Sequence, residues 1–258
     1  MRILFLSDIM GKGARKAVQQ ELAGLRRDLD LDFVVANAEN ASGGLGLSAK
    51  NARQLKEAGI DVMTGGNHIW RYKEIYPLLD QEPWLLRPAN YPPGAPGKGV
   101  AEFSPREGLD LAVINLEGRI FMDKLDCPFR TCREILSNTR AGIVLVDFHA
   151  EATSEKKALL HFFRGSVSAL IGTHTHVQTS DAQILDGYTG YITDAGMCGV
   201  QDSVIGMDPG SVMDAFLYGI PQKFEPATGQ VELQGVLLDI DQGTGAVQGI
   251  QAWRHTCT

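Results

Sequence analysis

Short runs of consecutive apolar residues recur along the first two thirds of the chain, and polar or amphipathic segments separate them. Runs of this length predict buried β-strands, and they occur at residues 2–7, 32–36, 60–64, 111–115, 143–146 and 167–171. Their apolar residues are consecutive rather than alternating, which is typical of strands in sheets that are covered on both faces. The pattern therefore indicates an α/β fold built on buried sheets.

The segments between these runs have a helical period. They predict helices at residues 14–29, 48–58, 71–79 and 154–163. Ser48 is suited to cap the second of these helices. Two further strands are predicted nearer the C-terminus, at residues 231–238 and 246–253.

The chain of 258 residues is long enough for one large α/β domain or two small ones. Prolines and glycines concentrate at residues 87–99 and break both kinds of element there. We interpret this segment as a connection and not as a boundary. The expected organisation is a single domain over residues 1–258.

Charge and composition exclude some classes of function. The net charge is −7 and the sequence has no Lys/Arg run, whereas proteins that hold long nucleic acids usually carry a basic patch. A small phosphorylated substrate remains compatible, because a bound metal would supply local positive charge. The sequence shows no signal peptide and no apolar run of membrane-spanning length, and its four scattered cysteines indicate reduced thiols. We therefore expect a cytoplasmic protein without membrane contacts.

Residues of the types that bind metals follow five of the predicted strands in succession. Each lies just past the end of its strand, where open α/β sheets bind their ligands. These residues are Asp8, Glu39, Asn40, Asn67, His68, His149, His174 and His176. A single residue of this kind would not indicate a site, but residues of this kind after five strands indicate a common site.

Each residue also has an ordinary structural explanation. Asp8 could cap the helix that follows it, Asn40 suits a turn, and a lone histidine such as His149 is more often a hydrogen-bonded core residue. The pair His174 and His176 is harder to explain in this way. In extended backbone, residues i and i+2 face the same side, so two imidazoles at this spacing favour a metal site.

Three of these histidines (His149, His174 and His176), with the two carboxylates and the two asparagines, are enough to bind two metal ions. A mixture of imidazole and carboxylate ligands suits Mn, Fe or Zn better than Ca or Mg. One carboxylate bound between the ions would hold them roughly 3.5–4 Å apart.

The motifs Ser-Asp-Ile-Met-Gly, Asn-Ala-Glu-Asn, Gly-Asn-His, Asp-Phe-His-Ala-Glu and Gly-Thr-His-Thr-His resemble one branch of the calcineurin-like metallophosphoesterase superfamily, the YmdB-like phosphodiesterases. The resemblance spans residues 8–176, with a further similar stretch at residues 190–197. The wider superfamily has the patterns D-x-H and G-D-x-x-D. Here Met10 stands in place of the first histidine and Asn-Ala-Glu-Asn replaces the second pattern, as in the YmdB-like branch.

The resemblance implies a four-layer α/β/β/α sandwich with two mixed β-sheets, and a homo-oligomer. It also implies two transition-metal ions per chain, with Glu39 between them. One ion would be held by Asp8, Glu39, Asn40 and His176, and the other by Glu39, Asn67, His149 and His174. Asn40 would then supply the oxygen that compensates for the histidine missing at Met10.

The function implied by the resemblance is hydrolysis of small phosphodiesters, including 2′,3′-cyclic or 3′,5′-cyclic nucleotides. A hydroxide activated by the two metals would attack phosphorus, and His68 would protonate the leaving alkoxide as general acid. His68 could instead be a hydrogen-bond partner of a metal ligand. The resemblance favours the acid role.

Two other classes of protein are alternatives to this one. Amidohydrolases and β-lactamase-like enzymes place their H-x-H motif early in the chain, whereas here Asp8 comes first and His174–His176 come late. The second alternative is a phospho-ligand or nucleotide sensor with the same fold and little turnover. Glu39 and His68 are both present, so the sequence gives no sign that the site has decayed.

Overall fold

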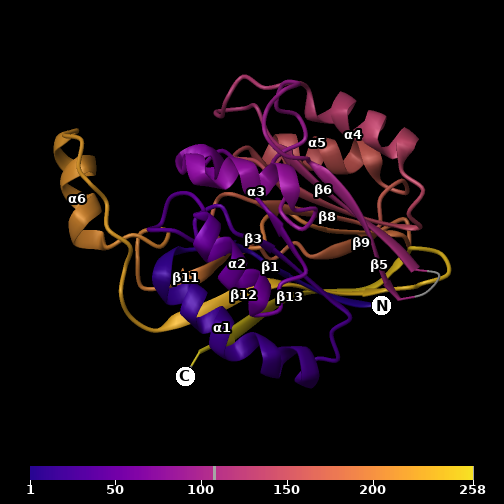
Figure 1. Cartoon of the computed structure of the whole chain (residues 1–258), viewed down its shortest axis with the longest axis horizontal. Helices are drawn as coiled ribbons and strands as arrows, with labels where there is room; N and C mark the ends of the chain where they lie inside the picture. Colours follow the sequence, from indigo (N-terminus) through magenta and orange to yellow (C-terminus); the bar gives the residue numbers. More distant parts are fainter. Residues whose placement is uncertain (107–108, 258) are drawn as a thin grey trace.

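The computed structural model describes residues 1–106 and 109–257, and it has two stacked β-sheets between outer helices (Figure 1). The first sheet has the strand order β2-β11-β12-β1-β3-β4, with β13 paired to β12. Its strands are β1 (Arg2–Leu6), β2 (Asp8–Ile9), β3 (Phe33–Asn37), β4 (Val62–Thr64), β11 (Met197–Val200), β12 (Val231–Ile240) and β13 (Val247–Thr256).

The second sheet has the order β5-β6-β7-β8-β10-β9. Its strands are β5 (Val100–Arg106), β6 (Leu109–Glu117), β7 (Ile143–His149), β8 (Ala169–Thr173), β9 (Gln183–Leu185) and β10 (Thr189–Ile192). Both sheets are mixed, because β1 is parallel to β3 but antiparallel to β12, and β6 is parallel to β7 but antiparallel to β5. The predicted α/β/β/α sandwich is confirmed.

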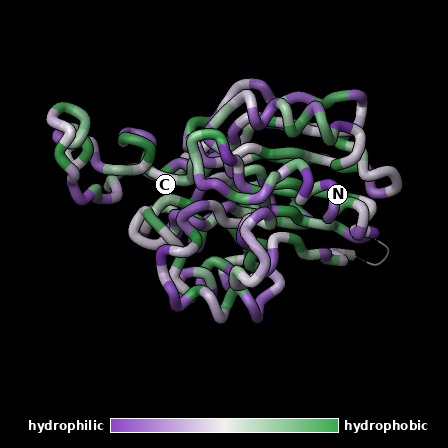
Figure 2. Tube along the Cα trace, turned by 90° about the horizontal axis from the view of Figure 1, so that it is seen from above, coloured by the Kyte–Doolittle hydropathy of each residue, from purple (hydrophilic) through white to green (hydrophobic). Residues whose placement is uncertain are grey.

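Strand β1 shows why its apolar residues are consecutive. Ile3 and Phe5 belong to the cluster between the two sheets, whereas Leu4 and Leu6 belong to the cluster beneath the helices. Successive side chains of a strand point to opposite faces, so a strand covered on both faces needs an apolar residue at every position. Figure 2 shows hydrophobic residues following the central strands of the molecule.

Helices cover the outer face of each sheet (Figure 1). α1 (Gly11–Asp28) and α2 (Ala49–Glu57) pack on the first sheet, and α4 (Pro128–Asn138) and α5 (Thr153–Phe163) pack on the second. Ser48 caps α2 by accepting a hydrogen bond from the backbone of Asn51, as its sequence position predicts. Among the described residues, no helix is both long and apolar enough to cross a membrane.

The helix predicted at residues 71–79 is present but begins five residues later than expected, at Tyr76. Two 3₁₀ turns, Ile69–Arg71 and Lys73–Ile75, come first, and the short helix α3 (Tyr76–Gln81) follows them. Pro77 explains the difference. Proline fits the first turn of a helix but removes a backbone hydrogen bond in a helix interior, so the helix begins beside Pro77 instead of running through it.

Several short elements have no counterpart in the sequence prediction. They are β2, β5, β9, β10, β11, α4 and the helix α6 (Pro209–Tyr218). α6 projects from the body of the molecule (Figure 1), and only Val212 in it is buried. A helix without a packed face lacks the apolar periodicity from which a helix is predicted.

A pair of glycines tests the register of the first sheet. A Cβ at Gly235 in β12 would overlap the backbone oxygen of Phe5 in β1, so Gly235→Ala should lower the free energy of unfolding by about 1–3 kcal/mol. A Cβ at Gly24 in α1 meets no atom within 4 Å, so Gly24→Ala should raise it by about 0.5–1 kcal/mol. Urea unfolding measures both changes, and a Gly235→Ala protein as stable as the parent would contradict the pairing of β1 with β12.

Candidate metal centre

Strand ends from both sheets meet at one place. Because β1, β3 and β4 are parallel to one another, and β7 is parallel to β8, the carboxyl ends of each group lie along one sheet edge. The two edges adjoin. The structure brings together all the residues singled out in the sequence, namely Asp8, Glu39, Asn40, Asn67, His68, His149, His174 and His176.

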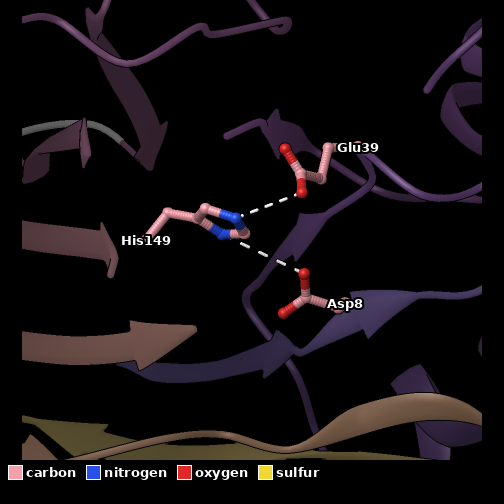
Figure 3. A group of neighbouring side chains, drawn as sticks. All are labelled: Asp8, Glu39 and His149. Atoms are coloured by element: carbon pink, nitrogen blue, oxygen red, sulfur yellow. Dashed lines mark ion pairs between the residues drawn. The ribbon is translucent and has the colours of Figure 1, made fainter. Parts of the chain in front are cut away.

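Asp8, Glu39 and His149 form the centre of this cluster (Figure 3). All three are fully buried, and each offers a ligand atom within 4.8 Å of the other two. The Nε2 atom of His149 lies 3.1 Å from Oε1 of Glu39, and its Nδ1 atom lies 4.0 Å from Oδ1 of Asp8. The ring of His149 therefore sits between the two carboxylates.

His176 lies beside Asp8, and Asn40 links His176 to Glu39. The Nε2 atom of His176 lies 3.5 Å from Oδ1 of Asp8 and 3.3 Å from Nδ2 of Asn40. Asn40 in turn lies next to Glu39, with 3.4 Å between its Nδ2 atom and Oε1 of Glu39. Asp8, Glu39, Asn40 and His176 are thus neighbours on one side of the cluster.

Two other residues surround His149. The Nδ1 atom of His174 lies 3.0 Å from Nε2 of His149, and Oδ1 of Asn67 lies 3.2 Å from the same nitrogen. These residues share Glu39 with the Asp8 side, because Oε1 of Glu39 contacts His149 as well as Asn40. The cluster therefore has two sides that meet at Glu39.

His68 lies at the rim of the cluster. Its Nδ1 atom is 2.8 Å from Oδ1 of Asn40 and 3.2 Å from Oε1 of Glu39, and its backbone N–H donates to Oε2 of Glu39. Its side chain is 36% exposed, whereas Glu39 is fully buried. His68 therefore contacts the buried carboxylate with one edge of its ring and can reach a molecule in solvent with the other.

The protonation states of the cluster depend on its burial and its charges. Burial opposes ionisation of Glu39, but His149 and His68 hold the pKa of its carboxyl well below the usual range. Burial also opposes charge on His149, yet the carboxylate of Glu39 raises its pKa to about 10. Burial and the nearby His149 lower the pKa of His174 to about 4. His174 is therefore neutral at pH 7, which is the form of imidazole that binds metals.

The segment that carries His174 and His176 is a strained turn. β8 ends at Thr173, and the φ angles of His174 and His176 are 102° and 63°. The expectation that an extended backbone presents the two rings is wrong, although both rings reach the cluster. A non-glycine residue in such a conformation costs about 1–3 kcal/mol and is typical of functional sites.

Neighbouring groups hold this turn in place. The backbone N–H of His174 donates to Oδ2 of Asp8 over 3.3 Å, and Nδ1 of His176 lies 2.9 Å from the carbonyl oxygen of Ile205. Ile205 itself has a φ of 47°, which is rare for a β-branched residue. The contacts of the cluster thus compensate for unfavourable backbone at three positions.

A layer of polar residues behind His149 was not assigned from the sequence. Asp147 accepts hydrogen bonds from Thr173 (2.7 Å) and Asn37 (3.2 Å), and both donors also lie beside Nδ1 of His149. Burial raises the pKa of Asp147 to about 6. Asp147 is two residues before His149 on β7, so the two share one strand face. The spacing of two residues between Asp147 and His149 was the one feature of the sequence from which a role for Asp147 beside His149 could have been predicted.

A buried ion pair supports the His174–His176 turn from behind. The Nζ atom of Lys156 in α5 lies 2.8 Å from Oδ2 of Asp194 and donates to the carbonyl oxygen of Thr173 over 2.9 Å. Asp194 also accepts a hydrogen bond from the backbone N–H of Thr175. The pair therefore contacts the backbone at two points of the segment that carries the histidines.

The donor atoms of the cluster fit a bound metal. Asp8 and Glu39 are fully buried, and Oδ1 of Asp8 has no hydrogen-bond partner among the described residues. A buried carboxylate oxygen is unfavourable unless it is paired or coordinates an ion. Gly66 has no side chain at the point where a Cβ would overlap both Glu39 and His149. Carboxylate, imidazole and amide ligands together suit Mn, Fe or Zn.

Comparisons with known proteins give a consistent result. The chain matches the family model described as YmdB-like protein over residues 4–253. It is 44% identical over 246 residues to the 2′,3′-cyclic-nucleotide 2′-phosphodiesterase of Bacillus subtilis (strain 168), an alignment that covers 95% of this chain and 93% of the relative.

Two crystal structures have the same fold over the whole chain. One is of a hypothetical protein from Thermus thermophilus, with a TM-score of 0.95, 43% identity and complete coverage of both chains. The other is of a novel phosphatase from Mycoplasma pneumoniae, with a TM-score of 0.94 and 35% identity, covering 100% of this chain and 94% of that one.

Two adjacent lysines test the support of the His174–His176 turn. Lys156→Met leaves Asp194 buried without its cation and should lower the free energy of unfolding by about 3–5 kcal/mol. Lys157 pairs with Asp181 at the surface, where both side chains are partly exposed, so Lys157→Met should cost at most about 1 kcal/mol. Guanidinium unfolding compares the two variants. Equal, small losses would show that the Lys156–Asp194 pair does not stabilise the fold.

Proposed function

Because the chain belongs to the YmdB-like protein family, we propose that it is a two-metal phosphodiesterase that hydrolyses small cyclic nucleotides. The observation that carries this proposal is the meeting of Asp8, Glu39 and His149, fully buried and within ligand distance of one another. Relatives named as a phosphodiesterase and a phosphatase support hydrolase activity. The name of the Bacillus relative favours 2′,3′-cyclic over 3′,5′-cyclic nucleotides.

The two sides of the cluster suggest two ion sites that share Glu39. Bound Mn, Fe or Zn ions would supply Lewis acidity, which lowers the pKa of water and offsets the charge of a phosphate group. The ligands of one ion would be Asp8, Glu39, Asn40 and His176, and those of the other would be Glu39, Asn67, His149 and His174.

His68 is the proposed general acid. Asn40 and Glu39 face its Nδ1 atom, so a proton on that nitrogen has two acceptors and the ring orientation is fixed. The opposite nitrogen, Nε2, is then the one that can give a proton to a substrate oxygen. Its partial exposure places His68 where a leaving ribose hydroxyl can depart into solvent.

The remaining expectations are part of the same proposal. We propose that residues 1–258 act as one metallophosphoesterase domain, since both sheets contribute to the cluster. The net charge of −7 supports small substrates over long nucleic acids.

The homo-oligomer implied by the family resemblance stays a prediction. α6 offers exposed apolar side chains at Met213, Leu217 and Tyr218 that a second copy could cover.

Metal content tests the shared role of Glu39. The protein loaded with Mn²⁺ and then freed of excess metal should retain about two ions per chain. Glu39→Gln should lose both ions, because its carboxylate contacts both sides, whereas Asp8→Asn and His176→Ala should each lose chiefly one. Elemental analysis by mass spectrometry gives the counts. Protein that carries no metal and hydrolyses phosphodiesters undiminished in chelator would refute the proposal.

The leaving group tests the role of His68. A ribose alkoxide needs a proton to depart, so His68→Ala should slow hydrolysis of a nucleoside 2′,3′-cyclic phosphate by about a hundredfold or more. A nitrophenolate departs readily without one, so hydrolysis of bis-p-nitrophenyl phosphate should fall far less. Metal content should stay near that of the parent, because His68 is not a proposed ligand.

Equal losses on both substrates with depleted metal would assign His68 to support of the metal ligands instead. If the parent protein, loaded with Mn²⁺, hydrolyses neither substrate, the sensor alternative replaces the enzyme.

A further inference from the structure

An apolar pocket of about 330 Å³ opens beside the candidate metal centre. Asn40, His68 and His176 form its edge toward the cluster. The rest of its lining is apolar and includes Met10, Leu45, Ile205, Met207, Phe216 and Phe224. The pocket therefore begins where the proposed phosphate site ends, on the side of the proposed general acid.

The floor of the pocket is built around Met10. Its side chain is only 6% exposed and packs against Met197, Met207 and Val212. Two glycines leave room for it: a Cβ at Gly206 would overlap the Met10 side chain, and a Cβ at Gly44 would lie 3.2 Å from its Cε atom. Met10 stands two residues after Asp8 in the chain, so the floor of the pocket is a polarizable thioether close in sequence to the metal centre.

The rim of the pocket consists of large apolar side chains in contact with solvent. Phe216 is 77% exposed on the projecting helix α6 (Figure 1), and Ile205, Phe224 and Leu45 are 54%, 39% and 38% exposed. Exposed apolar side chains gathered at the mouth of a pocket mark a binding site. They line the same pocket as His68 and His176, so a molecule bound in the pocket would lie next to the metal centre.

We propose that this pocket binds the base of the nucleotide, with the phosphate at the metal centre and the ribose at His68. The proposal rests on the phosphodiesterase function proposed above. Every base has an apolar π-face that can stack on an aromatic side chain, and Phe216 and Phe224 supply such side chains. Apart from Asn40, His68 and His176 at the edge beside the metal centre, the residues that line the pocket have no hydrogen-bonding side chain to read the edge of a base. The pocket therefore selects nucleotides over simple phosphodiesters but does not select among bases.

Steady-state kinetics on two classes of substrate test this. Nucleoside 2′,3′-cyclic phosphates carry a base, whereas glycerol 1,2-cyclic phosphate has the same strained ring without one. Base stacking on one aromatic side chain is worth roughly tenfold in affinity, so Phe216→Ala and Phe224→Ala should each raise KM for the nucleosides by about that factor, with kcat nearly unchanged. Glycerol cyclic phosphate should be hydrolysed by all variants alike, and the four nucleosides should differ less than about tenfold in kcat/KM.

Tyr218→Ala is the matched control. Tyr218 is an exposed aromatic residue on the same helix, but it does not line the pocket, so its loss should leave all KM values unchanged. Calorimetric binding of the product adenosine 3′-monophosphate adds a readout that does not depend on turnover. Phe216→Ala should weaken this binding about tenfold and leave the binding of ribose 3-phosphate unchanged.

The outcomes separate the two proposals. If the parent protein hydrolyses neither class of cyclic phosphate, the phosphodiesterase function itself fails. If it hydrolyses both and Phe216→Ala and Phe224→Ala change neither class, or change both equally, only the base pocket is wrong. A strong preference for one base would also contradict the pocket. A change in molecular mass in solution for Phe216→Ala, with unchanged nucleotide kinetics, would assign this surface to a second copy of the chain.

Discussion

Two carboxylates, those of Asp8 and Glu39, are completely buried side by side, and much of the structure follows from their need for positive charge. Burying an ionised carboxylate without a partner is highly unfavourable. Here the ring of His149 lies between them, and the carboxylate of Glu39 raises its pKa, so without a metal a proton on this ring would balance part of the charge. A bound metal ion would take the place of that proton, and Oδ1 of Asp8 is available to it, because His176 and His149 approach this atom only to 3.5 and 4.0 Å and it accepts no hydrogen bond from the described residues.

The sandwich of two sheets makes this arrangement possible. Each carboxylate comes from the first sheet and His149 comes from the second, so the cluster exists only where both sheet edges meet. The same packing buries β1 on both faces. Strained backbone at His174, His176 and Ile205 is tolerated there because hydrogen bonds from the surrounding core fix each position.

The grouping of the candidate ligands is written more plainly in the sequence than the elements around them. Ligand-type residues after successive strands could be found because strand ends share an edge, whatever the detail of each loop. The conformation of residues 174–176 could not, since positive φ angles at two histidines depend on tertiary contacts with Asp8 and Ile205. Helix α6 could not be predicted because it packs on little of the protein. Only Val212 in it is buried, so its sequence lacks the apolar periodicity of a packed helix. The apolar pocket depends on α6 and was missed with it.

Whether Glu39 joins two metal sites where the sheets meet can be measured by anomalous X-ray diffraction from crystals soaked in Mn²⁺, because this method locates each ion independently of activity. We expect two anomalous peaks, both in contact with the carboxylate of Glu39, one beside Asp8 and His176 and the other beside His149 and His174. A single peak, or ions bound away from Glu39, would contradict it.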